Sequence, residues 1–207
     1  MTAHSIEIIH DEHTAVAAVL RSLEMLTEEG PGGKPAGVFF EMLRSMLFYI
    51  DEFPERRHYP TESRVLFPML IRAAPELLAL IEQLEIDHES GERRVRELQN
   101  LLTAWEIVGD SRRAMFEAAL AEYVRFHMNH IRKEETQLLP VARRIFSPEE
   151  WKELDAAFEA QRDALAGGAR DAEYEALFSR IMITSIRSKV SMPAAPRVDR
   201  AKPTHMG

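Results

Sequence analysis

The chain has 207 residues, 45% of them hydrophobic and 29% charged, which is enough for one soluble domain with its own core. Its formal net charge of −8, without a clustered basic face, argues against nucleic acid as a partner. The absence of cysteine excludes disulfides, zinc–thiolate sites, iron–sulfur clusters and thiol catalysis.

Helical periodicity dominates the sequence from its first residues. Apolar side chains recur at three- and four-residue spacing over 6–25 and again over 39–53. The run Gly30-Pro31-Gly32-Gly33 predicts a loop between these two helices. Pro54 and Pro60 predict a bend or a restart after residue 53, because proline lacks an N–H and clashes with the preceding turn. A short helix to about residue 73 is expected to follow.

Two further long helices complete the predicted fold. Pro75 can open a helix that we expect to reach about residue 105, because proline is accepted in the first helical turn. Gly109 indicates a turn, and a long helix over 112–146 follows it. Four long amphipathic helices with short connections predict an all-α fold, with an antiparallel four-helix bundle over residues 1–146.

The remainder of the chain is expected to add helices to this bundle. Ser147-Pro148-Glu149-Glu150 is a capping box with proline at the first helical position, and it predicts a helix over 151–165. A last helix is expected over 173–189. Residues 147–190 would thus form additional C-terminal helices on or beside the bundle, and 191–207 a flexible tail. The last helix is a candidate contact for a homo-oligomer or a protein partner.

A doubled motif carries the chemistry of this sequence. The pattern H-x3-E-x5-P begins at His58 and again at His130, with an apolar pair before each proline. Residues i and i+4 share a helix face, so each copy places an imidazole beside a carboxylate. One further histidine, preceded by an acidic residue, lies on the helix before each copy, at His13 and His88. The pattern predicts two helical hairpins with matching sites.

Converging faces of four such helices would form a metal centre in the bundle core. Buried carboxylates are unfavourable without a compensating charge, and a pair of metal ions provides it. Two glutamates can bridge the metals while two histidines bind each one. Imidazole and carboxylate without thiolate suit iron, manganese or zinc, and an oxo- or hydroxo-bridged pair of iron ions fits a helical bundle. The expected ligands are His13, His58, Glu62, His88, His130 and Glu134.

Several polar residues lie next to the expected metal ligands in the sequence. His10 and His127 each lie one helical turn before an expected ligand, so each is either a fifth ligand or a histidine that only hydrogen-bonds near the site. Glu12, Asp87 and Glu135 adjoin ligands in sequence but lie off the ligand face. We therefore expect these three acidic side chains to be surface charges.

A second metal-binding pattern gives an alternative interpretation. Glu7-x2-His10, Glu55-x2-His58 and Glu85-x2-His88 all match the E-x2-H motif of ferritin-like di-iron bundles. This pattern leaves a ferritin-like di-iron oxidase as an alternative. The motif is short, however, and it leaves the doubled H-x3-E-x5-P pattern unexplained.

The doubled motif resembles that of the hemerythrin-like (HHE cation-binding) family. The resemblance rests on the six expected ligands, together with Leu66-Phe67-Pro68 and Leu138-Leu139-Pro140, and covers about residues 6–146. It implies a non-haem di-iron centre, in a family of oxygen carriers, oxygen or redox sensors, and proteins that repair iron–sulfur clusters. Oxygen-carrying members use five histidines, one Glu and one Asp, whereas the four-His, two-Glu set here is more similar to the repair proteins. Those proteins usually carry a cysteine-bearing domain, and this sequence has no cysteine.

These patterns lead to one functional expectation. We expect a di-iron protein that binds or reacts with O₂ or NO, in sensing, storage or protection, with iron donation to damaged clusters as the alternative; enzymatic activity is left open. Phe48, Phe67, Phe126 and Leu139 are expected to wall the site with apolar surface, while Tyr59 could bring a proton close to it. The charged start of the chain and the lack of an apolar stretch of about 20 residues predict a cytoplasmic protein without a membrane partner.

Overall fold

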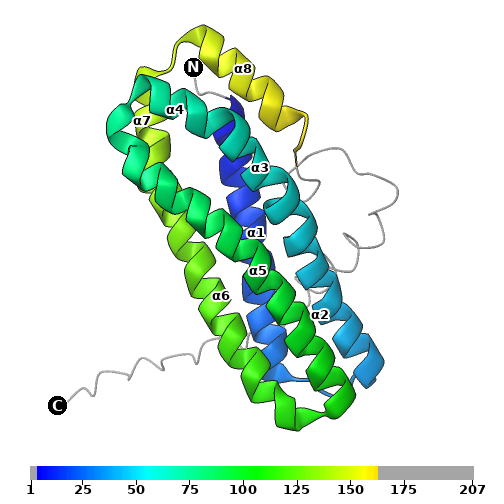
Figure 1. The fold of residues 1–207 in the computed structure, drawn as a ribbon. Helices are drawn as coiled ribbons and strands as arrows, with labels where there is room; N and C mark the ends of the chain where they lie inside the picture. Colours follow the sequence, from blue (N-terminus) through cyan, green and yellow to red (C-terminus); the bar gives the residue numbers. More distant parts are fainter. Residues whose placement is uncertain (1–3, 163–207) are drawn as a thin grey trace, which may run out of the picture.

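All regular structure in the computed structural model, which describes residues 4–162, is helical, so the predicted all-α class is confirmed. Long helices lie side by side, and a shorter one crosses one end of them (Figure 1). Helix α1 (His4–Glu29) contacts both α2 (Ala36–Ile50) and α6 (Arg113–Lys133), and α5 (Leu78–Val108) contacts the same two. The four helices therefore enclose a common interior. Within this range no helix is both long and apolar enough to cross a bilayer.

The segment from residue 36 to residue 73 is one unbroken helical column, so the chain does not restart a helix after residue 53. After α2 come a π-helical segment, Asp51–His58, the short α3 (Tyr59–Thr61), a π-helical turn, Glu62–Leu66, and α4 (Phe67–Ala73). Pro54 cannot donate a backbone hydrogen bond, and its ring displaces the carbonyl four residues back. The series of backbone hydrogen bonds continues with a wider spacing. The N–H of Tyr59 donates to the carbonyl of Pro54, five residues back.

The two copies of the sequence motif share one backbone geometry. A π-helical turn begins at the glutamate of each copy, over Glu62–Leu66 and Glu134–Leu138. In each turn the glutamate carbonyl accepts from the N–H five residues later, and the proline is the second residue of the next α-helix, α4 or α7 (Leu139–Ile145). The helix predicted over 112–146 is therefore present as a continuous column that ends at Ile145 and contains this π turn. Such π turns are frequent at functional sites.

The connections follow the glycine and proline signals. Gly30, Gly32 and Gly33 have φ of 67°, 55° and 83°, a left-handed conformation that favours glycine, and they form the loop after α1. Gly109, at φ 98°, ends α5. Short 3₁₀ turns, Pro75–Leu77 and Asp110–Arg112, lead into α5 and α6.

The capping box at Ser147 is confirmed, because its side chain accepts from the N–H of Glu150 and the Glu150 carboxylate accepts from the N–H of Ser147. It opens α8 (Pro148–Glu159), which packs against α1 across the end of the bundle (Figure 1). The helix predicted over 173–189 and the tail over 191–207 lie outside the described residues.

Two hydrophobic clusters fill the interior and leave a polar layer between them. One lies toward the far end of α1 and includes Val16, Leu20 and Trp105. The other includes Ile9 and Phe67, and helix α8 closes it with buried apolar side chains. His13 lies between these clusters along α1, so the predicted metal ligands occupy the layer that neither cluster fills.

Candidate metal centre

The structure brings all six predicted ligands together in the bundle interior. Each of the four helical columns contributes: α1, the column over residues 36–73, α5, and the column that begins with α6. Their side chains form two groups, and within each group the candidate ligand atoms all lie within 4.8 Å of one another. All members are buried. The first group is His13, His58, Glu62 and Glu134, and the second is Glu62, His88, His130 and Glu134.

The two glutamates belong to both groups because each directs one oxygen to each group. Oε1 of Glu62 lies 3.4 Å from Nε2 of His58, and its Oε2 lies 3.5 Å from Nε2 of His88. Glu134 repeats the arrangement: its Oε2 lies 3.2 Å from Nε2 of His13, and its Oε1 lies 3.0 Å from Nε2 of the histidine in its own motif. This is the placement that two bridging carboxylates require.

The donor set fits a pair of metal ions. The four histidine Nε2 atoms and all four carboxylate oxygens are buried and form no hydrogen bond with any described residue. A buried polar atom without a partner costs about 1–3 kcal/mol, and more when it is charged. Cations between these atoms would supply the missing partners and separate the two carboxylates. Imidazole nitrogen and carboxylate oxygen are ligands for iron, manganese and zinc.

Ion pairs within the cluster shift the pKa values of its carboxyl and imidazole groups. Burial disfavours ionised Glu134, but the neighbouring His130 outweighs it and holds the pKa of the carboxyl well below its ordinary value. Burial likewise opposes charging of His130, yet Glu134 and the nearby carboxylate of Asp87 raise the pKa of the imidazole to about 10. Metal ions would replace these protons, because a metal-bound imidazole must be deprotonated at the ligating nitrogen.

Comparison with protein families identifies the family to which this chain belongs. The sequence profile of the Hemerythrin HHE cation binding domain matches residues 4–142. The chain belongs to this family. Comparisons with curated proteins and with solved structures found no match. The match includes all six clustered residues, whereas α8 lies beyond it.

The HHE site has an outer layer of acidic side chains. The prediction that these are surface charges is wrong for Glu12 and Asp87, which are buried, whereas Glu135 is 34% exposed and still contacts the site. Nδ1 of His58 donates to Oε2 of Glu12 at 2.6 Å. Nδ1 of His13 donates to Oε1 of Glu135 at 3.1 Å. Carboxylates at these positions orient the imidazoles and raise their basicity toward a metal.

In the second hairpin of the HHE domain, Asp87 lies beside a ligand histidine as Glu12 does in the first. Its Oδ2 lies 3.6 Å from Nδ1 of His130 and accepts from Nζ of Lys133 at 2.8 Å. Burial opposes ionisation of Asp87, but hydrogen bonds from these two residues prevail and hold its pKa below the ordinary range. Asp87 directly precedes one lone histidine of the pattern, as Glu12 precedes the other. That shared acidic residue was the sequence signal for the outer layer.

These outer carboxylates give a prediction for metal affinity. Glu12→Gln and Asp87→Asn are each expected to weaken iron binding roughly 10- to 100-fold, because the imidazoles lose a charged partner. Competition against a chromogenic chelator measures the affinity. Asp11→Asn is the matched control, since Asp11 is exposed and pairs with Arg162 at the surface. Unchanged affinity in both variants would show that the outer acids do not tune the site.

The two additional histidines lie outside both ligand groups. The His10 side chain is 40% exposed, and its Nδ1 lies 3.0 Å from Oε1 of Glu135. His127 is fully buried, and its Nε2 accepts from the hydroxyl of Tyr59 at 2.6 Å. Of the two alternatives, the structure therefore favours hydrogen-bonding roles over a fifth ligand.

The E-x2-H pattern does not assemble a ferritin-like site in this HHE domain. The side chains of Glu7 and Glu85 are 58% and 42% exposed. Glu55 is buried, but its Oε1 accepts from the hydroxyl of Tyr123 at 2.9 Å. None of the three belongs to a ligand group.

Some of the residues predicted to wall the site with apolar surface are buried near it, and one is not. Phe67 is buried with its ring stacked 5.5 Å from His88, and Leu139 is buried as well. The Phe126 ring lies 5.9 Å from that of His127. Phe48 is 44% exposed, so the prediction that it walls the site is wrong.

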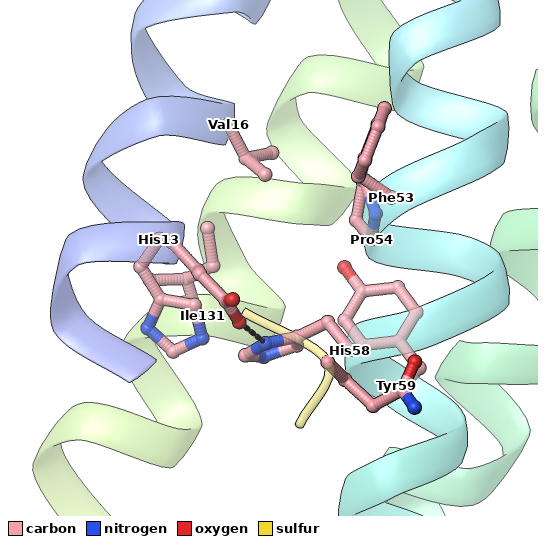
Figure 2. A pocket seen from close by; sticks show the side chains of 9 residues that line it. His13, Val16, Phe53, Pro54, His58, Tyr59 and Ile131 are labelled. Carbon is pink, nitrogen blue, oxygen red and sulfur yellow. Dashed lines mark hydrogen bonds and ion pairs between the residues drawn. The ribbon is translucent and has the colours of Figure 1, made fainter. Parts of the chain in front are cut away.

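A small cavity adjoins one ligand group of the HHE domain. Figure 2 shows His13 and His58 at its edge, with Val16, Phe53 and Ile131 supplying apolar surface. The two imidazole rings lie 5.2 Å apart, edge to face. The space suffices for about one water-sized molecule. On the other side of the site, Tyr59, which also lines the cavity, and Phe67 stack on His88.

Proposed function

We propose that this chain is a non-haem di-iron protein of antiparallel four-helix type that binds or reacts with O₂ or NO, in sensing, storage or protection against oxidative and nitrosative stress. The observation that carries the proposal is the sharing of Glu62 and Glu134 between two buried ligand groups. In this arrangement His13 and His58 would hold one iron, the other two histidines the second, and the glutamates both.

Iron is proposed over zinc because the expected reaction with O₂ or NO requires a metal that changes oxidation state, which zinc does not. When bound, an iron pair supplies electron-transfer chemistry toward small molecules. The protein contributes charge and orientation: Glu12 and Asp87 hold the outer nitrogens of two ligand histidines, so their Nε2 atoms face the site.

The cavity supports a small ligand. Its lining of Val16, Phe53 and Ile131 restricts bulk water, and its size excludes anything much larger than a diatomic molecule. Because the cavity adjoins His13 and His58, a ligand would approach at the side of these two histidines.

Reaction or sensing is favoured over bulk oxygen transport. A reversible carrier needs a dry pocket without proton donors, since water and acids promote oxidation of the metals. Here the cavity is lined by Glu12 and Tyr59 as well as by apolar groups. Each metal would also have two histidines and the same two carboxylates, so neither is set apart by its ligands.

The test is to load the protein with iron, reduce it anaerobically and admit O₂ while recording the absorption spectrum. We expect prompt oxidation of the iron that evacuation does not reverse. The same experiment with NO shows whether the site also takes that ligand. Oxygen that can be pumped off through many cycles would contradict this proposal and indicate a carrier.

A further inference from the structure

A tyrosine lies against the proposed metal ligands without being one of them. Tyr59 is 5% exposed, and its ring stacks on the imidazole of His88, with centroids 4.3 Å apart and planes within 14°. It also meets the ring of His130 edge-on at 5.0 Å. The phenol thus touches both histidines of one ligand group, at a distance that does not limit the transfer of an electron.

The hydroxyl of Tyr59 has a base as its partner. It donates to Nε2 of His127 at 2.6 Å, and no other described residue accepts from it. His127 is fully buried, and burial lowers the pKa of its imidazole, so the ring is neutral and its Nε2 carries a lone pair. A proton can therefore pass from the phenol to His127 within one buried hydrogen bond, without help from solvent.

The same interior contains a second buried tyrosine with a different partner. Tyr123 is 1% exposed, and its ring lies 4.7 Å from that of His127. Its hydroxyl donates to Glu55 at 2.9 Å, and burial raises the pKa of this carboxyl to about 8. At neutral pH Glu55 is thus mostly protonated and a poor proton acceptor. Tyr123 stacks on none of the six clustered residues in the described part of the chain, so it is a natural control.

We propose that Tyr59 and His127 form a redox-active pair that would give one electron to the iron pair after a peroxide, itself reduced to water, has oxidised that pair beyond the diferric state. One electron leaves the Tyr59 ring, and the iron pair is reduced by one electron. The phenol O–H bond breaks and the proton moves to Nε2 of His127, leaving a neutral phenoxyl radical beside an imidazolium. The inference rests on the proposed function, because the iron pair is the oxidant.

Proton transfer to His127 keeps the oxidised ring uncharged in a buried place. Oxidation of the phenol alone would leave a radical cation, an unpaired charge with few partners in a medium of low dielectric constant. With His127 as acceptor the phenol becomes a neutral phenoxyl, and the proton moves only across a hydrogen bond of 2.6 Å. The site can then discharge an oxidising equivalent onto Tyr59 instead of onto its ligand histidines.

The experiment uses the full chain, loaded with iron and brought to the diferric state, mixed with hydrogen peroxide and frozen for electron paramagnetic resonance. We expect an organic radical signal that narrows when the protein contains ring-deuterated tyrosine. Tyr59→Phe, which keeps the stacked ring, should lose the signal, whereas Tyr123→Phe should retain it. In His127→Gln the radical should form roughly 100-fold more slowly, because the proton acceptor is gone.

A second arm separates this inference from the proposed function. Iron content is measured in every variant, and the metal-free protein is treated with a photogenerated one-electron oxidant, a ruthenium(III) polypyridyl complex. Here too the radical should form on Tyr59 and be lost in Tyr59→Phe. Failure to bind iron, with Tyr59 still oxidised in this arm, would overturn the proposed function and support the redox pair. A radical on Tyr123, or one of equal yield in Tyr59→Phe, would overturn the inference.

Discussion

Replacing Glu62 or Glu134 with alanine is expected to reduce the metal content well below two ions per chain. Each carboxylate directs one oxygen to each ligand group, so its loss removes a ligand from both metals at once. Elemental analysis of protein purified from iron-supplemented cells gives the ratio. Glu62→Gln, which keeps the side-chain volume, shows whether the charge or the packing is responsible.

The controls for this experiment are Glu7→Ala and Glu85→Ala, at two exposed positions of the E-x2-H pattern. Both variants should keep two ions per chain. Full metal content after loss of Glu62 or Glu134, combined with metal loss in these two controls, would favour the ferritin-like ligand set. Circular dichroism establishes that every variant has kept its helices.

Removal of the metals is expected to lower the melting temperature by about 10 °C. Ions that bind only the folded state stabilise it by about 4 kcal/mol when present at 1,000 times their dissociation constant. In a chain of this size each kcal/mol corresponds to roughly 2–4 °C. In the metal-free protein, ion pairs such as that between His130 and Glu134 would still hold the cluster, so a folded but weaker state is expected.

Differential scanning calorimetry before and after chelation measures this change, and re-addition of iron should restore the original transition. The double variant Glu62→Gln with Glu134→Gln should show no response to chelator, because it lacks both shared ligands. An identical melting curve after verified metal removal would mean that the ions contribute nothing to the folded state.

Much of the helical architecture follows from short stretches of sequence. Apolar periodicity marks α1, α2, α5 and α6, and the capping box marks the start of α8, because these signals depend on contacts within one or two turns. The i, i+4 spacing likewise places His58 beside Glu62 on any helix. The doubled motif therefore identifies four of the six clustered residues, and the prediction of one centre also assumed that four helices pack with these faces together.

The course of the chain through its prolines depended on tertiary packing. Sequence signals located the irregularity at Pro54, and they permitted either a bend or a restart. Phe53 and Pro54 are buried, and this segment packs against α5. These contacts accompany a helical column that continues through the proline and absorbs the missing hydrogen bond in a π-helical segment.

The surroundings of the ligands were decided by the bundle as a whole. Successive residues on a helix point about 100° apart, so a residue next to a ligand faces away from the ligand side. On an isolated helix that direction leads to solvent, and Glu12 and Asp87 were predicted there. In a closed arrangement of helices it leads to the next helix, where these carboxylates reach His58 and His130. For the same reason only the folded chain could bring Tyr59 to His127, residues far apart in sequence on separate helices.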